Sequence, residues 1–181
     1  MRTIHRTQQH SLRAGFSLLE LLLYIGILVI VATVISGAFF SINQGRGHVE
    51  ATTEVNTNLR VAAEMIAQDI RSASAVSMPT GIGATSTALQ LVVHGTPLIY
   101  CLPDTHLRRE SGGGACTGAS PAVTADTVVV DAVEFTRTEN DNIPLGISFT
   151  TIGASLDMHY RSAAPEWQYA ARKQEFIPLY Q

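Results

Sequence analysis

The sequence is poor in the residues that mark common catalytic and metal-binding sites. Only two of its 181 residues are cysteines, and its six histidines form no ligand-like pair at short spacing. No nucleophile elbow, phosphate-binding loop or metal-binding helix motif is present. We therefore expect neither a catalytic centre nor a cofactor or metal, and we assign His94, His106 and His159 to loops or strand surfaces.

Charged side chains are also scarce, and they are unevenly distributed. They make up 15% of the chain, whose formal net charge is −3. Residues 1–15 carry three arginines and no acid, and residues 16–45 carry Glu20 as their only charge. The rest of the chain is therefore more acidic than the whole. This balance argues against a basic stripe, so we expect that the protein binds no nucleic acid directly.

An apolar run over residues 16–42 is long enough to span a bilayer. About 20 residues at 1.5 Å each cover a hydrocarbon core of about 30 Å. In a soluble protein such a helix would have to be buried on every side. The preceding arginines predict that residues 1–15 stay in the cytoplasm and that the chain after residue 45 lies outside it. An ordinary secretory signal is the alternative, but the run continues past a poor cleavage site at residues 35–37.

The start of this run, Gly15-Phe16-Ser17-Leu18-Leu19-Glu20, resembles the processing motif of type IV prepilins and type II secretion pseudopilins. In that family a short basic leader ends in glycine, a hydrophobic residue follows, and glutamate is the fifth residue after the cut. The resemblance implies that a prepilin peptidase cleaves between Gly15 and Phe16. It also implies that the same enzyme methylates the new amino group of Phe16.

Glu20 is an unusual residue for a membrane helix. A carboxylate at the bilayer centre costs about 2.5–3.5 kcal/mol, but Glu20 lies near the cytoplasmic interface, where the cost is lower. The resemblance implies that it pairs with the Phe16 ammonium of its own chain or of a neighbour during assembly. The alternative is a snorkelling side chain near a helix end. The implied partners are prepilin peptidase, other pilin or pseudopilin subunits, an inner-membrane assembly platform, and membrane lipid before assembly.

The helix is predicted to continue beyond the membrane. Apolar residues recur at spacings of three and four and so line one face; they are Val55, Leu59, Ala62, Ala63, Ile66, Ile70 and Ala73. We expect one helix over residues 17–77, loosened at 44–47 and stopped by Pro79 and Gly81.

Residues 79–181 are predicted to form a β-rich head. After a loop at 79–87, strand-like alternation marks 89–93, 98–102, 107–110, 128–137 and 147–160, with an edge strand within 167–180. Turns are expected at 95–97 and 139–142. The fold class is therefore α+β, with a long N-terminal transmembrane and amphipathic α-helix packed on an antiparallel β-sheet head, as in the pilin fold.

The head also resembles the minor pilins and pseudopilins of the PilW and GspJ type. The shared features are a strand that ends near Tyr100, a turn, and a following leucine-x-arginine strand at residues 107–109. Arg108 and Arg109 themselves are interpreted as a solvated strand end.

The predicted organisation has four parts. They are a cleaved basic leader (1–15), the transmembrane and assembly half of the helix (16–45), its amphipathic outer half (46–78) and the extracytoplasmic head (79–181). Cys101 and Cys116 would then lie where disulfides persist, and a bridge between them would close a ring of about 15 residues, worth about 3 kcal/mol. Two separate thiols are the alternative.

The predicted function is structural rather than enzymatic. We expect a minor type IV pilin or pseudopilin, held in the cytoplasmic membrane by a single pass and then assembled into a filament for adhesion, motility, DNA uptake or protein secretion. The alternative is a membrane-anchored extracytoplasmic binding module that does not assemble. A secreted enzyme with an uncleaved anchor would need a catalytic constellation that the sequence does not suggest.

Overall fold

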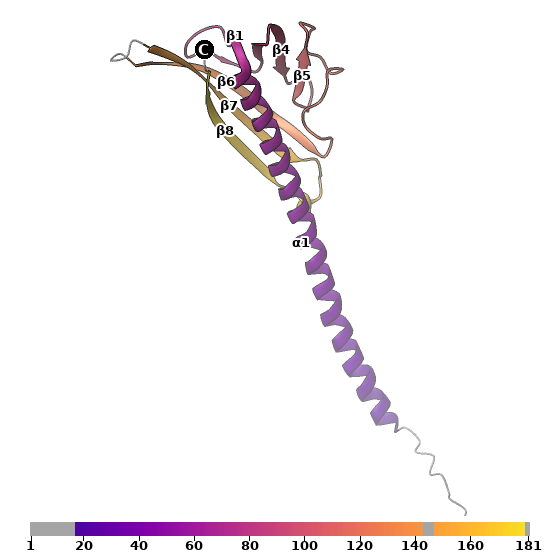
Figure 1. Ribbon diagram of the computed structural model, residues 1–181. Coiled ribbons are helices and arrows are strands. Elements are labelled where there is room, and N and C mark those ends of the chain that lie inside the picture. The colour runs from indigo at the N-terminus through magenta and orange to yellow at the C-terminus, as the bar shows by residue number, and fades with distance from the viewer. Residues whose placement is uncertain (1–16, 143–146, 180–181) are drawn as a thin grey trace, which may run out of the picture. The chain divides into compact units, whose positions relative to one another are not determined.

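The computed structural model describes residues 17–142 and 147–179, which form one long helix, eight strands and a short 3-10 helix (Figure 1). Helix α1 spans Leu18–Ser72. The strands are β1 (Ala73–Met78), β2 (Thr85–Ser86), β3 (Leu89–Val93), β4 (Thr96–Cys101), β5 (Arg108–Ser111), β6 (Val128–Asn142), β7 (Ile147–Tyr160) and β8 (Ala170–Pro178), with η1 (Pro165–Trp167) before the last. The chain divides into two compact units, one up to Asn43 and one from Gln44 onward.

The strands form two antiparallel sheets of four strands each. The first has the order β1-β3-β4-β5, and the second has the order β2-β6-β7-β8. The hairpin of β6 and β7 is the longest pairing and sets Phe135 opposite Ala154. The predicted α+β class and the antiparallel pairing are confirmed, although the head contains two sheets rather than one.

The second unit has one hydrophobic core between the outer part of α1 and both sheets. The apolar stripe predicted for the helix is buried, with Val55, Ile66 and Ile70 completely inaccessible. These side chains belong to one cluster with Leu89 and Tyr100 of the first sheet and with Phe135 and Leu156 of the second. Figure 1 shows this part of α1 running alongside β6, β7 and β8. Each fully buried Leu, Ile or Phe contributes about 1.5–3 kcal/mol, so this face holds the helix on the head.

Two predictions about the helix are wrong. α1 ends at Ser72 rather than near residue 77, and its helical structure continues over residues 44–47 without a loosened stretch. Residues 73–78 form β1, which pairs with β3 and sets Ala73 opposite Val93. The reason is tertiary: the edge of β3 offers backbone hydrogen bonds, and this pairing outweighs the local helical preference of the segment.

Two predicted turns are also displaced. The turn between β3 and β4 is formed by His94 and Gly95, both with positive φ (50° and 78°), as a hairpin turn of type I′ requires. Pro97 therefore lies inside β4, opposite Val92. The second turn was expected at 139–142, but β6 continues to Asn142.

Candidate functional site

The first half of α1 presents an unusually apolar surface. Every large hydrophobic side chain from Leu18 to Ile42 is at least 50% exposed, whereas the stripe from Val55 to Ile70 is buried. The helix is long and apolar enough to cross a membrane. A core helix of a soluble protein would bury such residues, so this segment requires an apolar environment.

Two hydroxyl groups inside this segment are satisfied within the helix itself. The hydroxyl of Thr33 donates to the carbonyl of Ile30 at 2.7 Å, and that of Ser36 donates to the carbonyl of Ala32 at 2.8 Å. Hydrogen bonds of this kind remove the need for water around the hydroxyls. They make both residues compatible with a lipid or protein environment.

Glu20 lies in the first turn of α1. The amide of Leu21 donates to the carbonyl of Ser17 at 3.1 Å, which makes Ser17 the N-cap and Glu20 the third helical residue. Ser-x-x-Glu is the capping-box sequence, and a carboxylate is favoured near the positive end of the helix dipole. Glu20 therefore occupies a position at which a carboxylate favours the start of a helix.

The predicted processing site lies outside the described residues. Gly15 and Phe16 both belong to that stretch, so cleavage after Gly15, methylation of Phe16 and pairing of the Phe16 ammonium with Glu20 all stay predictions. The structure describes the chain only from Ser17, immediately after the predicted new N-terminus.

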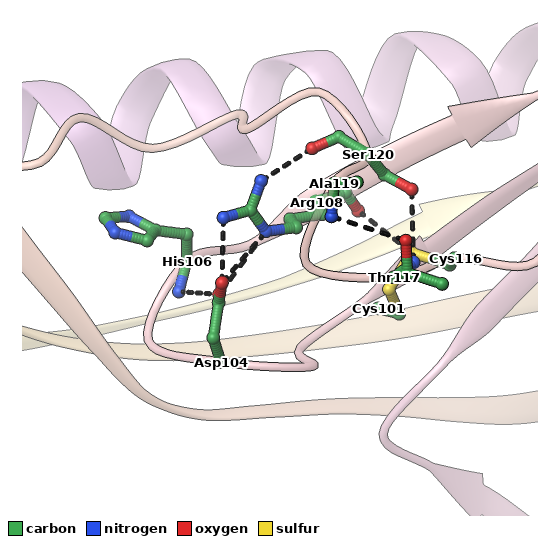
Figure 2. Close-up of a disulfide and its surroundings, with 8 residues drawn as sticks. All are labelled: Cys101, Asp104, His106, Arg108, Cys116, Thr117, Ala119 and Ser120. Carbon is green, nitrogen blue, oxygen red and sulfur yellow. Dashed lines mark hydrogen bonds and ion pairs between the residues drawn. A yellow bond between two sulfur atoms is a disulfide. The ribbon is translucent and has the colours of Figure 1, made fainter.

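In the head, Cys101 and Cys116 form a disulfide, which confirms the predicted pairing. Their Cα atoms are 6.2 Å apart, and the bridge joins the end of β4 to the loop that follows β5 (Figure 2). The ring closed by the bridge therefore contains the whole of β5 and the glycine run at residues 112–114. This constrains the most glycine-rich part of the head.

Arg108 fastens the same region from inside the ring. Its guanidinium donates to the Asp104 carboxylate (Nη2 to Oδ2, 2.7 Å) and to the carbonyl of Ser120 (2.6 Å), as Figure 2 shows. The hydrogen bond from Arg108 is the main cause that lowers the pKa of Asp104, and the backbone amide of His106 adds to it. Arg108 thus ties the loop before β5 to the loop after Cys116.

Arg109 joins the first sheet to the helix. It donates to both carboxylate oxygens of Asp69 on α1 at 2.8 and 3.2 Å, and the Tyr100 hydroxyl donates to the same carboxylate. Burial, followed by the hydrogen bond to Asp69, raises the pKa of the Tyr100 phenol. The hydrogen bond to Asp69 also raises the pKa of Arg109.

The prediction that Arg108 and Arg109 form a solvated strand end is therefore wrong. Only 15% and 35% of their side chains are exposed, and each is paired with a carboxylate. The sequence analysis did not identify Asp69 as the partner of Arg109, although the position of Asp69 on the helix gives a signal. It lies three residues after Ile66, directly beside the buried stripe, where an acid needs a partner from the head.

The three histidines of the head have different environments. His94 lies in the β3–β4 turn and His159 near the end of β7, as expected for surface positions. His106 lies in the loop before β5, as expected, although its side chain is only 13% exposed and its Nε2 atom is 3.6 Å from Asp126. Among residues 17–142 and 147–179, no three His, Cys, Asp or Glu side chains are arranged to hold a metal ion.

A cavity of about 410 Å³ lies where β7 leads to β8. Its walls are formed by His159, Tyr160, Ser162, Gln168, Tyr169 and Ala170. The sequence analysis did not identify it. The available signal is the density of aromatic residues around 160–169, which includes Trp167, the single tryptophan of the chain.

The disulfide ring, the Asp69 cluster (Asp69, Tyr100 and Arg109) and the cavity all belong to the second unit. Glu20 and the exposed apolar surface belong to the first unit. In comparisons with known proteins, the chain matches no protein-family model, no curated protein and no solved structure.

Proposed function

We propose that the protein is a minor type IV pilin or type II secretion pseudopilin, a structural subunit that assembles into a filament through the first half of α1. The observation that carries the proposal is the exposed apolar surface from Leu18 to Ile42, with Glu20 as its single charge, placed in the first turn. This surface is followed by an α+β head that contains a disulfide, a crosslink that persists outside the cytoplasm.

The exposed surface suits two successive environments. Lipid surrounds it in the membrane, and neighbouring subunits surround it in the filament. Transfer from lipid to a helix bundle brings little hydrophobic gain, because lipid tails are as apolar as leucine. Selection of the correct neighbour and register must then come from close packing and from polar pairing. Glu20 is the only charged residue between residues 16 and 45 that can supply such pairing.

The proposed partner of Glu20 is the ammonium group of Phe16, created when prepilin peptidase removes residues 1–15. At a separation of about 4 Å and an effective dielectric constant of about 20, such a pair attracts by about 4 kcal/mol before desolvation is subtracted. The pair forms with a neighbouring subunit delivered by the inner-membrane assembly platform. A mispaired carboxylate in an apolar bundle costs free energy, which penalises a wrong register.

The proposed topology follows from the charge distribution. Three arginines and no acid precede the span, so the leader remains in the cytoplasm and the head lies outside it. The Cys101–Cys116 bridge is consistent with this orientation, because disulfides persist outside the reducing cytoplasm.

The experiment compares Glu20→Gln and Glu20→Ala with the parent chain for membrane insertion and for recovery in sheared filaments. Glutamine can replace glutamate in a capping box but carries no charge, so it separates the two roles of Glu20. We expect both variants to insert into the membrane and both to be lost from filaments. Glu64→Gln, at an exposed glutamate on the outer part of α1, is the matched control. Normal incorporation of Glu20→Gln would contradict the proposed charge pairing.

A membrane-anchored binding module that does not assemble is the second candidate. The cavity beside Tyr160 and Tyr169 favours it, because a ligand site in the head needs no filament. The two candidates differ in their N-terminus. A module that is only anchored retains residues 1–15, whereas the proposed subunit loses them before assembly.

A further inference from the structure

The cavity at the β7–β8 connection has the features of a small-ligand site. Its volume of about 410 Å³ lies within the range of about 300–1,000 Å³ found for small-molecule pockets. All six residues of its wall come from a short stretch, 159–170, at the end of one hairpin. The cavity therefore lies entirely within the head.

The described residues of the wall favour an uncharged ligand. None of them is Lys, Arg, Asp or Glu, so neither an anion nor a cation would find a full opposite charge among them. The wall combines two tyrosine rings with the hydroxyl of Ser162 and the amide of Gln168. Such a wall offers flat apolar faces together with hydrogen-bond donors and acceptors.

The side chains around the cavity are held in place before any ligand binds. The Tyr160 ring stacks on Trp167 with centroids 5.5 Å apart. The Tyr169 ring meets His48 edge to face at 6.0 Å, and its hydroxyl accepts a hydrogen bond from Asn56 at 3.3 Å. Both tyrosines are thus fixed, and fixed groups lose less entropy on binding.

His159 and Ser162 add directed polar groups. The Nδ1 atom of His159 lies 2.8 Å from the Asp131 carboxylate, which sets the ring orientation and leaves Nε2 for a ligand. The Ser162 oxygen accepts from the amide of Ala164 at 3.2 Å, so its proton remains available for donation. Two hydrogen-bonding groups and two aromatic faces therefore surround one small space.

We propose that this cavity binds a neutral sugar unit. A sugar ring has C–H faces that pack on aromatic rings, and its hydroxyls both donate and accept hydrogen bonds. That combination matches the two tyrosine rings, the Gln168 amide and the Ser162 hydroxyl. The site is independent of the proposed filament function, since all of its residues lie in the head.

Trp167 provides the readout, because it is the single tryptophan and stacks on a wall residue. The full chain in detergent micelles is titrated with glucose, galactose and N-acetylglucosamine while Trp167 fluorescence is recorded. We expect a saturable change with at least one sugar and a Kd of about 1 mM. Ligand-observed NMR with the same sugars checks the binding independently.

Gln168→Ala is the test variant, because Gln168 is exposed and its loss should not disturb folding. Gln174→Ala is the matched control, since Gln174 is also exposed but lies on β8 away from the cavity wall. We expect Gln168→Ala to weaken sugar binding about tenfold and Gln174→Ala to leave it unchanged. Equal affinities for the two variants would overturn the proposal. So would the absence of any saturable change, or saturation by phenol with none by the three sugars.

Discussion

The guanidinium of Arg109 donates to the Asp69 carboxylate with an Nε to Oδ2 distance of 2.8 Å, linking β5 to α1. Tyr100 on the neighbouring strand donates to the same carboxylate. One helix acid therefore receives hydrogen bonds from two strands of the first sheet. Leu107, two residues before Arg109, is completely buried in the hydrophobic core.

Replacing Asp69 should therefore weaken the attachment of the helix to the head. Asp69→Ala leaves the Tyr100 hydroxyl and the Arg109 guanidinium without their shared acceptor in a partly buried place. We expect the free energy of unfolding to fall by about 2 kcal/mol. Chemical denaturation of the full chain in detergent, followed by Trp167 fluorescence, measures it.

The control for that experiment is Glu64→Ala. Glu64 pairs with Arg60 one turn away at 3.0 Å, but the two side chains are 64% and 75% exposed. We expect a change below about 0.5 kcal/mol. Equal losses for the two variants would show that the Asp69 cluster has no special importance.

Stability should fall at alkaline pH because of Tyr100. Burial and the hydrogen bond to Asp69 raise the pKa of this phenol, so the folded protein retains a proton that the unfolded chain releases above about pH 10. The stabilisation is complete below pH 10 and is lost as the pH rises further. Unfolding midpoints measured between pH 8 and pH 11 should decline less steeply for Tyr100→Phe than for the parent chain. Parallel curves would contradict the assignment.

Stability should also fall at acid pH because of Asp157. The hydrogen bond from Arg172 lowers the pKa of this carboxyl, so the unfolded chain takes up a proton first as the pH decreases. The contribution is present above about pH 4 and is lost as the pH falls through the lowered pKa. Thermal unfolding between pH 7 and pH 3 should show a smaller acid loss for Asp157→Asn. Glu50→Gln, at an exposed position on α1, should follow the parent chain.

The disulfide ring should contribute through the unfolded state. Removing Cys101 and Cys116 together, as the double serine variant, frees a loop of 15 residues. We expect the free energy of unfolding to fall by about 3 kcal/mol. Adding a reducing agent to the parent chain should give a similar loss and should not affect the double variant. If the reducing agent breaks the bridge in the parent chain but leaves its free energy of unfolding unchanged, the prediction is contradicted.

Much of the fold was predictable from periodicity. The apolar run, the helical stripe around Ile66 and the alternation around Phe135 correspond to the exposed half of α1, its buried half and β6. The boundaries that failed depended on contacts distant in sequence. Residues 73–78 form a strand because they pair with β3, and the local sequence pattern does not predict this pairing.

The polar features of the head were less predictable than its fold. The pairing of Cys101 with Cys116 was predictable because the head is expected outside the cytoplasm and the chain contains no other cysteine. The pairing of Arg109 with Asp69 was not, since Asp69 is 40 residues away from Arg109 along the chain. The cavity depends on the pairing of β7 with β8, which brings Tyr160 beside Tyr169 so that the Tyr160 amide donates to the Tyr169 carbonyl at 2.9 Å.

The most direct measurement for the proposed function is N-terminal peptide mass spectrometry on the full chain co-expressed with a prepilin peptidase, with an inactive peptidase as the control. We predict a mature chain that begins at N-methylated Phe16 with the active enzyme, and an intact N-terminus with the inactive one. Retention of residues 1–15 with the active enzyme, or a cut after residue 37, would contradict assignment to the pilin class.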